Sequence, residues 1–201
     1  MSATAKDRLA TMEKIRNTAT RVTKITMGLR KFARETRGDP AKATGVQEIL
    51  EETLPFCMER LKQNSVELRV APVEQSLRID CRPTEISQVL LNLLNNAVDA
   101  AEPLKEKWVE VKVKNVGTDV EISVMDRGKG IPKQFRDKVG QPFFTTKQVG
   151  HGTGLGLSIS KGIVEAHGGH LNLDAEYEHT RFVLTLPKAV SAKKEAVGVQ
   201  G

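Results

Sequence analysis

Four glycines fall within seven residues of this chain, at Gly150, Gly152, Gly154 and Gly156, and the segment 158–166 directly after them has the composition of a helix. Glycine leaves backbone N–H groups uncovered, and the start of a helix carries a partial positive charge. The run therefore predicts a loop that holds phosphate groups at the N-terminus of a helix. On this run alone, a plain flexible turn is the alternative.

Helical and strand-like periodicities alternate along the middle of the chain. Helices are expected over 46–64, with a bend at Pro55 and with Cys57 and Met58 facing inward, and over 83–102. Apolar and polar residues alternate on both sides of a turn at 117–119, which predicts a hairpin. Further strands are expected at 66–70, 77–79, 170–173 and 181–186. Helices and antiparallel strands without regular strand–helix–strand crossovers favour the α+β class, as a two-layer sandwich.

The N-terminal part of the chain has a different pattern. From Met12 to Ala33, apolar or small residues recur at steps of three and four, which is typical of a long helix with a heptad seam. Such a helix needs a second copy of the chain or a neighbouring helix to cover the seam. Gly38-Asp39-Pro40 breaks the pattern, so we expect a helical unit at 1–38, one domain at 45–188 and a disordered tail at 189–201.

Charge and cysteine content exclude several function classes. The net charge is +6, but the basic residues are interleaved with 25 acidic ones and form no basic run with aromatic partners, so nucleic acid is not an expected partner. Cys57 and Cys81 match neither a disulfide framework nor a metal motif, which favours the cytoplasm. No apolar run approaches the ~20 residues that cross a bilayer, which leaves open a membrane anchor in a longer parent protein.

Polar residues share one face of the otherwise apolar helix expected over 83–102. Asn92, Asn96 and Asp99 are spaced by four and three residues, so their side chains converge. The amide oxygen of Asn96 is a suitable ligand for Mg²⁺, which accepts hard oxygen ligands and shares them with phosphates. A structural amide pair that bonds nearby backbone is the alternative.

A second cluster, Asp126-Arg127-Gly128-Lys129-Gly130, follows the hairpin. A carboxylate at the end of a strand, followed by two glycines, suits a flat heterocycle with an exocyclic amine, because the glycines leave room for the ring. A turn in which Asp126 caps the next helix is the alternative.

A third cluster occupies 141–147, just before the glycine run. Phe143 and Phe144 are candidate core anchors. The three residues after them offer hydroxyl groups and an ammonium group to phosphates. For the lysine among these three residues, an ordinary surface position is the alternative. These three residues are Thr145, Thr146 and Lys147.

In this order the clusters resemble the N, G1, F and G2 boxes of the sensor histidine kinases, whose ATP-binding domain shares its fold with gyrase and MutL. The resemblance covers about 46–186 and implies a Bergerat-type fold that binds ATP with Mg²⁺. It implies that Asn96 ligates Mg²⁺, that Asp126 recognises the adenine amino group, and that Thr180 lies beside the adenine. It adds Asn92 and Lys147 to Asn96 as catalytic residues. The other nucleotide-binding residues that it implies are Gly128, Gly130, Thr145, Thr146, Gly150, Gly152, Thr153, Gly154, Leu155, Gly156 and Leu157.

The resemblance also bears on the reaction. Hydrolytic relatives carry a glutamate where this chain has Asn92, and an amide lacks the basicity to activate water, which favours phosphoryl transfer to a protein side chain. The N-terminal helix resembles the second helix of the dimerisation and phosphoacceptor hairpin. None of the four histidines has a phosphoacceptor context, so we expect the acceptor outside this chain, with a homodimer and a response regulator as partners. These histidines are His151, His167, His170 and His179.

Three alternatives share the nucleotide site with this hypothesis. They are a nucleotide-dependent interaction module, a gyrase-like ATPase, and a serine kinase of the same fold.

Overall fold

The computed structural model describes Met12 and residues 40–147 and 152–189. The predictions for the rest of the 1–38 helix, for Gly150 and His151, and for the tail after 189 fall outside this range. No helix among the described residues is long and apolar enough to span a membrane.

One layer of the domain is a five-stranded sheet in the order β2-β4-β5-β7-β6. Its strands are β2 (Glu67–Val70), β4 (Trp108–Val116), β5 (Asp119–Asp126), β6 (His170–Leu173) and β7 (Arg181–Pro187). β4 and β5 form the predicted hairpin, and β5, β7 and β6 continue the antiparallel order. β2 instead pairs in parallel with β4. The connection from β2 to β4, which runs through α4 (Pro83–Ala101), is therefore a strand–helix–strand crossover that the sequence pattern did not predict.

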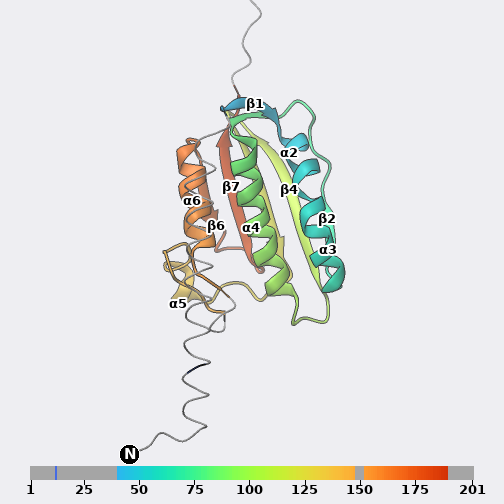
Figure 1. Cartoon of the computed structure of the whole chain (residues 1–201), viewed down its shortest axis with the longest axis vertical. Helices are drawn as coiled ribbons and strands as arrows, with labels where there is room; N and C mark the ends of the chain where they lie inside the picture. The colour runs from blue at the N-terminus through green and yellow to red at the C-terminus, as the bar shows by residue number, and fades with distance from the viewer. Residues whose placement is uncertain (1–11, 13–39, 148–151, 190–201) are drawn as a thin grey trace, which may run out of the picture.

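Helices form the second layer and lie on one face of the sheet, with α4 and α6 next to each other and α2 and α3 beside them (Figure 1). Their bounds are α2 (Val46–Thr53), α3 (Pro55–Gln63), α4 (Pro83–Ala101), α5 (Lys133–Arg136) and α6 (Gly156–Ala166). Pro55 begins α3 and so divides the predicted 46–64 helix, as expected. The predicted α+β sandwich is confirmed.

Sequence analysis missed two short elements and wrongly placed two side chains in the core. The two-stranded sheet of β1 (Lys42–Gly45) and β3 (Arg78–Cys81) was expected only in its second strand, because small residues dominate β1. The single turn of α5 is too short to show periodicity. Met58 is 38% exposed and Phe143 is 57% exposed, so neither is a core residue.

The core explains why α4 holds one row of polar residues in place. We call this row the polar stripe; it consists of Asn92, Asn96 and Asp99. Leu90, Leu93 and Leu94 are each about 1% exposed and pack with Val109 and Ile122 of the sheet. Burying side chains of this size stabilises the fold by roughly 1.5–3 kcal/mol each. Burial of this apolar face fixes the orientation of α4 about its own axis, so the half-buried polar stripe faces away from the sheet.

Candidate nucleotide-binding site

Asn92 joins α4 to the start of α6. Its Nδ2 donates a hydrogen bond to the Ser160 hydroxyl at 3.0 Å. A Cβ atom on Gly156 would lie 2.3 Å from Asn92 Oδ1, so only glycine allows this approach. The first polar cluster and the glycine run therefore lie side by side at this point.

Lys147 reaches the other end of the polar stripe. Its Nζ donates to Asn96 Oδ1 at 3.0 Å and to Asp99 Oδ2 at 2.5 Å. Arg60 of α3 donates to the other carboxylate oxygen of Asp99 and to Asn95 Oδ1, the latter at 2.7 Å. Arg60 lies far from the motifs in sequence, and sequence analysis missed it.

Asp126 lies buried at the end of β5, with an exposed fraction of 4%. Burial raises the pKa of this carboxyl to about 6, while hydrogen bonds from the Gly128 N–H, at 2.7 Å, and from the Thr180 side chain act in the opposite direction. A Cβ atom on Gly128 would lie 2.4 Å from Asp126 Oδ1 and 3.5 Å from the Ala100 Cβ. The pair of predicted residues thus forms a tight carboxylate site against the end of α4.

An aromatic pair supports the loop around Gly128. His179 Nδ1 lies 3.2 Å from the Gly128 carbonyl oxygen, and the His179 ring meets Trp108 edge to face with centroids 5.4 Å apart. The guanidinium of Arg69 lies over the Trp108 ring, 5.2 Å from its centroid. Gly130 has φ +74, which favours glycine. Sequence analysis did not predict the contact between His179 and Trp108.

The segment before the glycine run packs against the run itself. A Cβ atom on Gly152 would lie 2.7 Å from Thr145 Oγ1, and one on Gly154 would lie 2.4 Å from the carbonyl carbon of Phe143. Thr145 Oγ1 also accepts a hydrogen bond from the Lys147 N–H at 3.2 Å. The third cluster and the glycine run are therefore one unit in space.

The remaining predicted residues differ in exposure. The Thr153 hydroxyl accepts a hydrogen bond from the Leu155 N–H at 3.3 Å. Leu155 is buried and Leu157 packs against the core, so both contribute packing. Thr146 is exposed, and Phe144 contacts Phe135 with ring centroids 5.8 Å apart.

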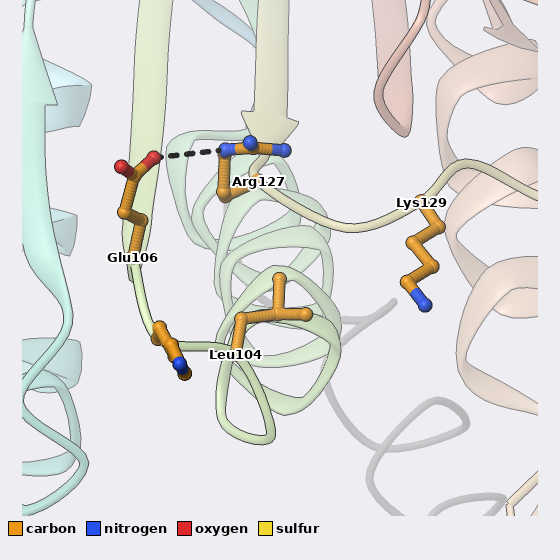
Figure 2. Close-up of a pocket in the computed structure, with 5 residues that line it drawn as sticks. Leu104, Glu106, Arg127 and Lys129 are labelled. Atoms are coloured by element: carbon orange, nitrogen blue, oxygen red, sulfur yellow. Dashed lines mark hydrogen bonds and ion pairs between the residues drawn. The ribbon is translucent and has the colours of Figure 1, made fainter.

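A basic hollow of about 270 Å³ lies beside the Gly128 loop. Figure 2 shows Arg127 pointing toward Glu106, with Leu104 below this pair and Lys129 farther along the loop that follows Arg127; Arg127 Nε lies 3.4 Å from the Glu106 carboxylate. Lys105 completes the lining. Within 40–147 and 152–189, no group of three or more His, Cys, Asp or Glu side chains could hold a metal ion.

The sequence matches known proteins along most of its length. Residues 81–190 match the family described as histidine kinase-, DNA gyrase B-, and HSP90-like ATPase. The C4-dicarboxylate transport sensor protein DctB of Rhizobium meliloti is 32% identical over 178 residues, which is 89% of this chain and 28% of that protein. The sensor histidine kinase ZraS of Escherichia coli is 33% identical over 153 residues, 76% of this chain and 32% of that protein. The chain thus spans about a third or less of the length of these curated relatives.

Solved structures agree with the sequence relatives. The catalytic domain of histidine kinase ThkA superposes with a TM-score of 0.66 at 30% identity, over 74% of this chain and 95% of that one. ThkA in complex with response regulator protein TrrA gives a TM-score of 0.67 at 24% identity, over 84% of this chain and 48% of that one, and so supports the fold alone. The chain belongs to the histidine kinase-, DNA gyrase B- and HSP90-like ATPase family and contains a catalytic domain of the sensor histidine kinase type.

Proposed function

We propose that this domain binds ATP together with Mg²⁺ and transfers the γ-phosphate to a histidine side chain in the protein to which it belongs. The observation that carries the proposal is the buried carboxylate of Asp126, enclosed by Gly128 and Thr180 at the end of α4. A buried carboxylate beside a glycine that admits no side chain suits a planar ring with an exocyclic amine.

The position of the phosphates follows from α4. Gly128 lies against Ala100, and Gly156 lies against Asn92, so these two glycines flank about two turns of the helix. A nucleotide whose adenine meets Asp126 would therefore extend its phosphates along the stripe, toward the start of α6. The positive end of a helix dipole stabilises phosphate charge there.

The residues of the stripe fit a divalent cation that arrives with the phosphates. Asn96 Oδ1 accepts a hydrogen bond from an ammonium group, so this oxygen already faces a cation. Mg²⁺ bound there would neutralise charge on the triphosphate. Asn96 would hold the ion, and Lys147 would contribute a second positive charge beside it.

Asn92 favours transfer over hydrolysis. Its Nδ2 donates to Ser160, and the oxygen that is left has no basicity with which to take a proton from water. Catalysis would then depend mainly on positioning and charge stabilisation.

We infer a histidine on a phosphoacceptor helix as the first acceptor, a second copy of the protein as the dimer partner, and a receiver domain as the next acceptor. The sensor kinase relatives support this inference by similarity. Use of ATP and the free, buried Cys57 and Cys81 support a cytoplasmic location for the domain.

A direct transfer assay tests the proposal. The chain is mixed with a separately expressed phosphoacceptor hairpin from a related sensor kinase and with ATP labelled at the γ-phosphate. Acid-labile label on the hairpin histidine, lost in the Asp126→Ala variant, is the expected result. Binding without transfer would favour an interaction module, steady phosphate release would favour an ATPase, and acid-stable label on serine would favour a serine kinase.

A further inference from the structure

The ammonium group of Lys147 lies where the proposed function places a divalent cation. Lys147 Nζ lies 3.0 Å from Asn96 Oδ1 and 2.5 Å from Asp99 Oδ2. Both oxygens belong to α4, one turn apart on the same face, and the backbone N–H of Lys147 is held by Thr145 Oγ1 at 3.2 Å. The side chain therefore reaches Asn96 from a segment that is itself bonded.

Asp99 is the stronger of the two anchors for Lys147. It carries a full negative charge, whereas Asn96 offers only an amide dipole, and its exposed fraction of 26% limits screening by solvent. Arg60 binds the opposite oxygen of Asp99 and also bonds Asn95, so the Asp99 carboxylate is held from its far side as well. With its rotamer fixed in this way, Asp99 presents one oxygen to Lys147.

We propose that Asp99 is a positioning residue that, held by Arg60, stations Lys147 on Asn96, so that the Lys147 ammonium and Mg²⁺ compete for the same oxygen. This inference rests on the proposed function, because it assumes that Asn96 ligates the metal. Asp99 does not contact the metal in this account. It sets how strongly nucleotide binding depends on Mg²⁺.

Geometry makes the two cations exclusive at Asn96. Mg²⁺ binds oxygen at about 2.0–2.1 Å in near-octahedral order, closer than any ammonium, and two positive charges repel at that range. When Mg²⁺ takes Asn96 Oδ1, Lys147 retains Asp99 or moves to a phosphate. Without Mg²⁺, Lys147 provides positive charge at the same place.

A chemical labelling experiment on the nucleotide-free chain tests the positioning step. Lysines are acylated under limiting reagent, and the rate at Lys147 is compared by mass spectrometry with that at Lys161, an exposed lysine 3.9 Å from Glu165. The Asp99→Asn variant should raise the rate at Lys147 about fivefold, the size expected for one partly exposed ion pair, and leave Lys161 unchanged. Arg60→Gln should act in the same direction. An unchanged rate at Lys147 in both variants would overturn the positioning role.

Calorimetry with ADP tests the competition, because ADP lacks the γ-phosphate and cannot support transfer. The measured quantity is the magnesium factor, defined as the Kd in EDTA divided by the Kd in Mg²⁺. The Lys147→Met variant should raise this factor about fivefold, while the Lys161→Met control leaves it unchanged. Asp99→Asn should raise the factor when Lys147 is present but not in the Lys147→Met background, since residues that act through each other are not additive.

Other outcomes would count against the proposal in distinct ways. An unchanged or lower factor in Lys147→Met, or loss of all nucleotide binding, would show that Lys147 does not compete with the metal. A large fall in the factor for Asp99→Asn in the Lys147→Met background would make Asp99 a metal ligand instead. If the unmodified chain bound neither ADP nor ATP with Mg²⁺, the proposed function itself would fail, whatever the labelling rates.

Discussion

Asp126 should destabilise the folded domain at neutral pH, and Asp126→Asn should relieve that effect. Burial raises the pKa of the Asp126 carboxyl from an ordinary value of 3.8 to about 6. Between these values the folded state binds more protons than the unfolded state, so the free energy of unfolding falls as pH rises from about 4 to about 7. At about 1.4 kcal/mol for each pKa unit, the loss amounts to about 3 kcal/mol. An asparagine at this position still accepts the Gly128 hydrogen bond through Oδ1 but does not ionise.

Urea unfolding at a series of pH values measures this effect, with circular dichroism and the fluorescence of the single tryptophan, Trp108, as probes. The free energy of unfolding of Asp126→Asn minus that of the unmodified chain should be about 2.5 kcal/mol larger at pH 8 than at pH 4, where the unfolded carboxyl is already partly ionised. All other titrating groups cancel in this difference. Asp80→Asn, on the exposed side of β3, is the matched control for replacing an aspartate by an asparagine. A difference that stays within about 1 kcal/mol over the whole range, or that has the opposite sign, would refute the reasoning.

Further outcomes follow from the same geometry. Binding of Mg-ATP, measured by calorimetry, should weaken about 10- to 100-fold in Asp126→Asn, because the adenine amine loses a charge-assisted hydrogen bond; an affinity within twofold would contradict the assigned contact. Gly156→Ala should weaken nucleotide binding at least about tenfold, since its Cβ would displace Asn92, whereas Gly162→Ala on the same helix meets open space and should raise the free energy of unfolding by about 0.5–1 kcal/mol. Cys81, whose pKa burial raises to about 11, should resist iodoacetamide at pH 8 until the chain is unfolded.

The parts of the fold that were predicted correctly have local causes. Pro55 and Pro83 mark the starts of α3 and α4, and period-two alternation marks the β4–β5 hairpin. The spacing of Asn92, Asn96 and Asp99 was enough to place them on one face. What sequence reasoning missed depends on pairing between distant segments.

The ion pairs around Asp99 illustrate which contacts cannot be predicted from local sequence patterns. Arg60 and Lys147 reach the same carboxylate from positions 39 residues before it and 48 residues after it. No local sequence pattern predicts either contact, and a basic residue on a helix or loop most often faces solvent. The parallel pairing of β2 with β4 is similar, because a four-residue strand carries no information about its neighbour.

The glycines of the site act mainly through the space that they leave, and this explains why their spacing in the sequence carries so much information. Gly128 and Gly156 lie in segments that are far apart, yet a Cβ at either position would clash with a side chain of the site, with Asp126 of β5 at Gly128 and with Asn92 of α4 at Gly156. Glycine is destabilising inside a helix by roughly 0.5–1 kcal/mol relative to alanine, and Gly156 is accepted at the first residue of α6, where that effect is smallest. Gly128 and Gly156 therefore provide room for close packing and not loop flexibility. This packing places the polar stripe of α4 between the proposed site for the adenine ring and the proposed site for the phosphates.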